Sequence, residues 1–104
     1  MLNEYSIGDS RELLKEVESS SVDLIYIDPP YCTGRDFYHF NDKFKSSADY
    51  RDLLMRPILT ECHRILSDVG NIVVHVEPKI SHHIRIVLDD IFGEKRFKNE
   101  IVWV

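Results

Sequence analysis

Residues 22–27 form an almost unbroken apolar run, and two prolines bring it to an end. The run, Val-Asp-Leu-Ile-Tyr-Ile, is rich in strand-forming residues. Such a run suits a strand that is covered on both faces, as in a parallel sheet. Pro29 and Pro30 have no N–H to donate to a neighbouring strand, so the strand must stop at Asp28. The sequence therefore predicts a buried strand with a carboxylate directly after its carboxyl end.

Strand-like and helix-like patterns alternate along the other segments of the 104 residues. The expected strands are 2–7, 22–27, 72–76 and one that begins at 101. The stretch 31–47 is polar and aromatic without a clear period, which predicts a long loop. The alternation predicts an α/β domain with a mostly parallel sheet and right-handed crossovers.

Three helices are expected between these strands. The first begins with Asp9 as its N-cap and ends at the serines 19–21. The second opens with Ser46, runs to about residue 66, and is expected to kink or break at Pro57. The third begins at Pro78 and ends at residue 93. The expected core-facing residues of the second and third helices are Leu53, Leu54, Ile58, Cys62, Ile65, Leu66, Ile80, Ile84, Val87, Leu88 and Ile91.

The charge and the cysteines narrow the class of protein. The net charge is -5, whereas a DNA-binding domain usually carries a basic excess, so any DNA contact needs a local basic patch or basic residues from another segment. Cys32 and Cys62 form no CxxC pair, which is typical of reduced thiols in a cytoplasmic protein. The first residues do not resemble a signal peptide, and no apolar window is long enough for a membrane span. His75 is expected to be a hydrogen-bonded core residue, and no spacing indicates a metal site.

Asp9 and Asp28 both follow expected strands. In an open parallel sheet, ligands bind at the carboxyl ends of the strands, so this is where a site is expected.

The tetrapeptide Asp28-Pro29-Pro30-Tyr31 resembles the DPPY motif of the N4/N6 amino-group DNA methyltransferases. The resemblance extends over almost the whole chain and keeps the family's order. It is closest to the permuted β group, which includes the modification subunits of type III restriction systems. The flanking segments that carry it are 22–27, 33–37, 40–44, 66–70, 73–76, 81–83, 91–93 and 97–103.

This resemblance implies a Rossmann-like methyltransferase fold and transfer of a methyl group from S-adenosylmethionine to a flipped-out adenine N6. In the family, aspartate at Asp28 usually accompanies adenine, and the alternative acceptor is cytosine N4. An exocyclic amine is a poor nucleophile because its lone pair is delocalised into the ring. The Asp28 carboxylate and the Pro29 carbonyl can accept its two hydrogens, Pro30 stiffens the segment, and Tyr31 offers a ring for stacking.

The resemblance also implies a cofactor site and a DNA surface. Gly8, Asp9 and Ser10 look like the family's segment that reaches the adenine amino group of S-adenosylmethionine, and Asp28 borders the same site. Asp9 as a plain helix N-cap is the competing interpretation, and the two roles are compatible. The candidate DNA contacts are Arg35, Phe40, Lys43 and Lys45, although scattered cations are usually just solvated. No metal is implied.

The sequence departs from the family because no glycine-rich FxGxG segment is present and no target-recognition region follows. Residues 1–104 are therefore expected to be one incomplete catalytic domain that is marginally folded alone. Its expected partners are DNA and a missing C-terminal half, a second subunit or a restriction subunit. Its expected location is the cytoplasm of a bacterium or archaeon, or of a cell infected by a phage. A non-catalytic remnant of such an enzyme is the remaining alternative.

Overall fold

A computed structural model gives the structure of the chain and describes residues 3–30, 36–37, 40–41 and 46–104. The strands are β1 (Val22–Ile27), β2 (Asp36–Phe37), β3 (Phe40–Asn41) and β4 (Leu66–Val74). The α-helices are α1 (Ser10–Leu13), α2 (Ser47–Asp49), α3 (Arg56–Ile65) and α4 (Pro78–Phe92). A π-helical segment, Tyr50–Met55, joins α2 to α3, and 3₁₀ turns at Leu14–Glu16 and Glu94–Arg96 follow α1 and α4.

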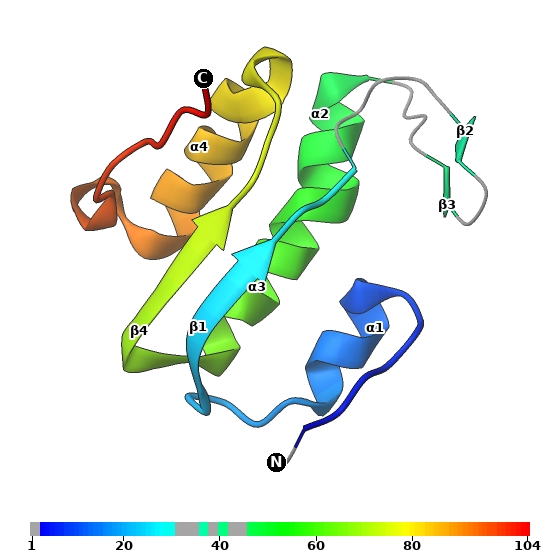
Figure 1. Cartoon of the computed structure of the whole chain (residues 1–104), viewed down its shortest axis with the longest axis vertical. Coiled ribbons are helices and arrows are strands. Elements are labelled where there is room, and N and C mark those ends of the chain that lie inside the picture. The colour runs from blue at the N-terminus through cyan, green and yellow to red at the C-terminus, as the bar shows by residue number, and fades with distance from the viewer. Residues whose placement is uncertain (1–2, 31–35, 38–39, 42–45) are drawn as a thin grey trace.

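β1 and β4 pair in parallel and form the sheet on which the helices pack (Figure 1). From Leu24 opposite Asn71 the pairing runs in regular register to Ile27 opposite Val74. Before it, Val22 lies opposite Leu66, so β4 bulges over residues 67–70. A Cβ on Gly70 would lie 2.6 Å from the side chain of Leu66 and 3.1 Å from the Val22 carbonyl oxygen, so the bulge leaves no room for a larger residue there.

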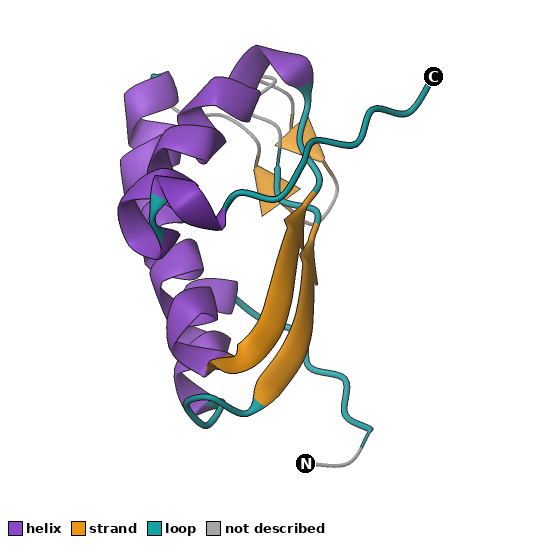
Figure 2. Cartoon of the chain, turned by 90° about the vertical axis from the view of Figure 1, so that its left-hand side faces the viewer, coloured by secondary structure: helices purple, strands orange, loops and turns teal. Residues whose placement is uncertain are grey.

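The helices cover one face of this sheet, and Figure 2 shows all of them on the same side of β1 and β4. Ile25 and Ile27 of β1 are partly buried on that side, whereas Leu24 and Tyr26 are exposed. The expectation of a strand covered on both faces is therefore wrong for this chain. The reason is topological, because successive right-handed crossovers that progress in one direction along a sheet place their helices on the same face.

The helical stretch 46–65 begins and breaks where the sequence predicts. The Ser46 hydroxyl caps it by accepting the Asp49 N–H at 3.1 Å, and Pro57 lies in the first turn of α3 after the π-helical segment. A π-helix has more residues per turn than an α-helix, so the apolar stripe shifts its phase between residues 50 and 55. Tyr50 and Met55 consequently face the core, while Leu53 is 61% exposed and was wrongly predicted to be a core residue.

The core lies between the helices and the covered face of the sheet. The part of the core that α4 supplies was predicted correctly. Ile80, Ile84 and Val87 are buried, and Leu88 and Ile91 pack against them. Tyr50, Met55 and Leu59 complete the fully buried cluster.

The expected terminal strands are not formed in the described part of the chain. Residues 3–9 and 97–104 have no regular structure, and their large apolar residues Tyr5, Ile7, Ile101 and Trp103 are exposed. A strand forms only beside a hydrogen-bonding neighbour, and neither segment lies in a sheet here. The expected loop 31–47 contains the short antiparallel pair of β2 and β3.

The accessible surface is large for a chain of this mass. It measures 8124 Å², whereas a compact monomer of 12.2 kDa exposes about 6100 Å². Part of the excess is apolar and lies on the bare face of the sheet, at Leu24, Tyr26 and Val73.

Leu59→Ala should destabilise the fold by about 2–5 kcal/mol, because the side chain is fully buried and its removal leaves a cavity. Leu53→Ala on the same helical stretch is the matched control and should change the free energy of unfolding by about 0.5 kcal/mol or less. Urea denaturation followed by circular dichroism measures both. Equal losses in the two variants would contradict the shifted phase of the helix.

Candidate active site

Asp28 lies one residue beyond β1, where the diproline ends the strand. The His75 N–H donates to the Ile27 carbonyl at 2.8 Å, which extends the parallel ladder by one bond past β4. This bond holds the residue after each strand at the same edge of the sheet. The Asp28 side chain is 55% exposed there, so its carboxylate is accessible to a ligand.

Tyr26, Asp28 and His75 lie together on the uncovered face. Residues two apart in an extended strand share a face, which places Tyr26 and Asp28 on the same side. The Tyr26 hydroxyl lies 3.0 Å from His75 Nδ1, and that nitrogen lies 3.8 Å from an Asp28 carboxylate oxygen. In a neutral ring with its hydrogen on Nε2, Nδ1 accepts the hydroxyl hydrogen of Tyr26, whereas a protonated ring pairs with the carboxylate. The expectation that His75 is a core residue is wrong, although it is hydrogen-bonded, because it follows β4 on the bare face.

The two prolines connect Asp28 to the core. Pro29 is buried and Pro30 is partly buried, so the segment turns inward directly after the exposed carboxylate. The hydroxyl of Tyr50 donates a hydrogen bond to the Pro30 carbonyl. Tyr31, the last residue of the motif, lies outside the described residues.

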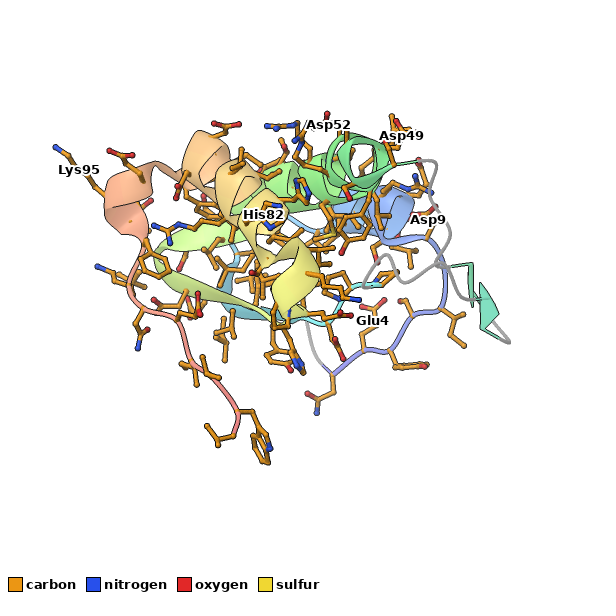
Figure 3. The ribbon with its side chains drawn as sticks, turned by 90° about the horizontal axis from the view of Figure 1, so that it is seen from above. Glu4, Asp9, Asp49, Asp52, His82 and Lys95 are labelled. Atoms are coloured by element: carbon orange, nitrogen blue, oxygen red, sulfur yellow. The ribbon has the colours of Figure 1, made fainter. Side chains whose placement is uncertain are left out.

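Asp9 belongs to a second cluster, at the start of α1 (Figure 3). Its carboxylate accepts the backbone N–H of Arg11 at 2.9 Å. It also forms a salt bridge with the Arg11 guanidinium, in which Nη2 lies 2.7 Å from Oδ2. The predicted N-cap role is therefore confirmed. Within the described residues, every hydrogen bond of the Asp9 side chain goes to Arg11.

Arg11 also ties this cluster to the helical stretch. Pro57 has no N–H to donate to the carbonyl of Leu53, four residues earlier, and Arg11 Nη1 donates to that oxygen at 3.3 Å. The break in the helix thus supplies the acceptor that orients Arg11, and Arg11 in turn orients Asp9.

The guanidinium of Arg11 lowers the pKa of Asp9 to about 2 from its ordinary value of 3.8. The hydrogen bonds to the ionised form are the main cause. Three donors of Arg11 make four hydrogen bonds to this carboxylate, because Nε is shared between Oδ1 and Oδ2. The Asp9 side chain nevertheless remains 46% exposed.

The neighbours of Asp9 in the predicted cofactor segment have local structural roles. Gly8 packs against Leu13, since an added Cβ would lie 3.0 Å from that side chain. Ser10 is the first residue of α1 and is exposed.

The predicted DNA contacts fall mainly outside the described residues. Arg35, Lys43 and Lys45 lie there, and only the backbone of Phe40 is described, in β3. Arg51 and Arg56 both pair with Asp52, at 2.9 and 3.2 Å, so part of the nearby basic charge is neutralised.

Other chemistries find little support among the residues that the structure describes. They contain no group of three His, Cys, Asp or Glu side chains that could hold a metal ion. Burial raises the pKa of the Cys62 thiol to about 11, so this cysteine stays protonated and is a poor nucleophile. No described helix has the length and apolar character needed to cross a membrane.

Comparison with known proteins agrees with the motif and the sheet. The profile of a DNA methylase family, the N6/N4 methyltransferases, matches residues 22–104. The chain belongs to this family. Its fold is accordingly an incomplete α/β methyltransferase fold, and the two parallel strands with Asp28 at their end are a part of it.

Three relatives illustrate how much of the chain is shared. The type II methyltransferase M.KpnI of Klebsiella pneumoniae is 32% identical over 105 residues, which cover 92% of this chain and 25% of the relative. The DNA adenine methyltransferase YhdJ of Escherichia coli K12 is 31% identical over 96 residues, which cover 92% of this chain and 31% of YhdJ. The StyLTI Mod subunit, of a type III restriction-modification enzyme of Salmonella typhimurium, is 26% identical over 130 residues, which cover 97% of this chain and 20% of the subunit. The chain thus spans a third or less of the length of each of these relatives.

Sequence reasoning missed Arg11, Tyr26, His75 as a site residue, and Tyr50. Two of them carried a usable signal, because Tyr26 precedes Asp28 by two residues and His75 follows the neighbouring parallel strand. Arg11 and Tyr50 gave no local signal, since their contacts depend on the break in the helix.

Arg11→Gln should raise the pKa of Asp9 toward 3.8, because the ionised form loses its charged partner. In the wild type the stabilisation from this pair is fully present above pH 4 and is lost as the pH falls through about 2. A pH titration of the Asp9 side-chain carboxyl ¹³C resonance measures this. Lys15→Gln, which removes another cation of the same N-terminal segment, should leave the Asp9 titration unchanged. An unaltered titration in Arg11→Gln would contradict the assignment.

Proposed function

We propose that the protein containing this chain transfers a methyl group from S-adenosylmethionine to adenine N6 in DNA, within a restriction-modification system. The observation that carries the proposal is the accessible Asp28 carboxylate, which the diproline and the β1–β4 pairing hold at the carboxyl edge of the sheet. The adenine specificity draws support from YhdJ, whose name states that activity, and the system from the Mod subunit.

Asp28 and the Pro29 carbonyl supply the acceptors that an exocyclic amine needs. Two hydrogen bonds to acceptors fixed by the fold draw the amino hydrogens toward a tetrahedral arrangement and free the nitrogen lone pair for attack. S-adenosylmethionine, when bound, supplies the electrophilic methyl group. The diproline limits the motion of both acceptors, so little ordering is required when the base arrives.

Asp9 is the proposed ligand of the cofactor's adenine amino group. The carboxylate fits this role, because it stays ionised and its side chain is 46% exposed, so an amino group can reach it. Gly8 and Ser10 flank it and complete the proposed segment.

We also propose that residues 1–104 form one part of a larger catalytic domain. The bare face of the sheet and the exposed segments 3–9 and 97–104 leave apolar surface that further strands and helices can cover. The FxGxG segment and the target-recognition region would belong to that other part. DNA is the proposed substrate, and a restriction subunit is the proposed partner.

Asp28→Ala should lower the methylation rate by about a hundredfold to a thousandfold, because the transition state loses a charged acceptor. The assay uses the full-length protein that contains this chain, radiolabelled S-adenosylmethionine and mass spectrometry of the digested nucleosides. Asp68→Ala, which removes an exposed carboxylate of the β4 bulge, is the control and should retain wild-type activity.

N6-methyl-2′-deoxyadenosine is the expected product in the digest. Detection of N4-methylcytosine instead would show that the methyl acceptor is cytosine, and the proposed role of Asp28 would stay the same. Absence of both products in the wild type would identify a remnant without catalysis.

Leu24→Ala tests whether a larger domain covers the bare face. In the 104-residue chain the side chain is exposed, so the change should alter the free energy of unfolding by about 0.5 kcal/mol or less. In a longer protein that includes the FxGxG segment, the same change should cost about 2–5 kcal/mol, because the leucine is buried there.

Ile86→Ala, on the outer side of α4, is the control and should have a small effect in both proteins. Denaturant unfolding gives all of the values. Equal small effects of Leu24→Ala in both proteins would show that the face stays exposed.

A further inference from the structure

We propose that Tyr50 is a positioning residue for the methyl-accepting segment: its buried hydroxyl fixes the Pro30 carbonyl and thereby aims Asp28 and the Pro29 carbonyl. The inference rests on the proposed function and adds to it a residue twenty positions away in the chain. Tyr50 lies in the core and acts through the backbone of the motif.

Tyr50 is firmly anchored in the core. It is 0% exposed and belongs to the buried cluster with Met55, Leu59 and Ile84. Its N–H donates to the Ser46 carbonyl at 3.1 Å, so the residue is fixed at the start of the helical stretch as well. Its hydroxyl donates to the Pro30 carbonyl, and Figure 1 shows the segment after β1 running toward the helical stretch between α2 and α3.

The diproline makes such an anchor necessary. Neither Pro29 nor Pro30 has an N–H, so the backbone of these two residues can be hydrogen-bonded to the fold only through its carbonyl groups. The last ladder bond is donated by His75 to the Ile27 carbonyl. Asp28 and Pro29 therefore lie between two hydrogen-bonded carbonyls, one held by the sheet and one held by Tyr50.

The hydroxyl reaches Pro30 because of the π-helical segment. Tyr50 and Met55 both face the core across this wide turn, while Leu53 points to solvent. π-helical turns recur at functional sites, where they re-aim a side chain at a local cost in helix geometry. The π-helical turn thus interrupts the regular apolar stripe of the helix and directs the Tyr50 side chain toward Pro30.

The first experiment detects the hydrogen bond itself. Pro30–Tyr31 is the single Pro–Tyr pair in the sequence, so labelling with [1-¹³C]proline and [¹⁵N]tyrosine yields one carbonyl–nitrogen correlation. Tyr50→Phe keeps the ring and removes the donor, so the Pro30 carbonyl resonance should move upfield. Tyr5→Phe, at an exposed tyrosine, is the matched control and should leave it in place.

The wild type offers a second measurement that needs no variant. A Tyr50 hydroxyl proton with a scalar coupling to the Pro30 carbonyl carbon would demonstrate the bond directly. An unmoved resonance in folded Tyr50→Phe, or a hydroxyl proton coupled to a different carbonyl, would overturn the proposal. The wild-type measurement decides the point if Tyr50→Phe does not fold.

The second experiment measures the effect of the bond on the reaction, in the full-length protein that contains this chain. Tyr50→Phe should lower kcat by about tenfold to a hundredfold, because a misaimed acceptor pair costs alignment at the reacting nitrogen. KM for S-adenosylmethionine should stay within about twofold, since the Tyr50 hydroxyl is directed at Pro30, whereas the proposed cofactor contact is Asp9. Asp68→Ala, the control used above, should match the wild type in both constants.

The outcomes separate this inference from the proposed function. A wild type that methylates DNA, with an unchanged kcat in Tyr50→Phe, would overturn the positioning role and leave the proposed function standing. A rise in KM for S-adenosylmethionine at unchanged kcat would likewise overturn it, because Tyr50 would then serve cofactor binding. A wild type without methylation would refute the proposed function and the catalytic part of this inference together, while the NMR experiment still decides whether Tyr50 holds Pro30.

Discussion

Parallel pairing of β1 with β4 is the constraint on which the other features depend. Because the two strands run in the same direction, the residues that follow them meet at one edge, and this brings Asp28 beside His75. The same pairing requires a crossover between the strands, and its helical stretch supplies Tyr50, Met55 and Leu59 to the core, while α4, which follows β4, supplies the rest. Site and core are therefore two consequences of one ladder of hydrogen bonds.

The regular parts of the fold were accessible from the sequence. α4 keeps a strict helical period from Pro78 onward, so its buried residues Ile80, Ile84 and Val87 could be chosen from spacing alone. β1 could be delimited because prolines end a ladder for a simple covalent reason. The motif at Asp28–Tyr31 could be recognised from its own residues, its place after a strand and the segments that flank it.

The errors arose where a long-range contact or a missing neighbour decides the structure. Leu53 was wrongly assigned to the core because the prediction assumed a constant α-helical period, whereas a π-helical turn changes the period there. The second face of β1 and the terminal strands were mispredicted because an apolar run reveals what it can bury, whereas its actual cover depends on other segments. The contact from Tyr50 to Pro30 was inaccessible for both reasons, as it spans twenty residues and depends on the shifted phase.

The π-helical segment also limits which changes in chain length this region can accept. Deleting one residue between Tyr50 and Met55 would remove the wide turn and bring the apolar residues before and after it into one helical phase, with the interruption at Pro57 remaining. The same deletion would rotate Tyr50 about the helix axis by roughly 100°, away from Pro30. Substitutions that keep the number of residues preserve the phase that directs Tyr50 at Pro30. A gain or loss of a single residue changes that phase and removes the contact that aligns the motif.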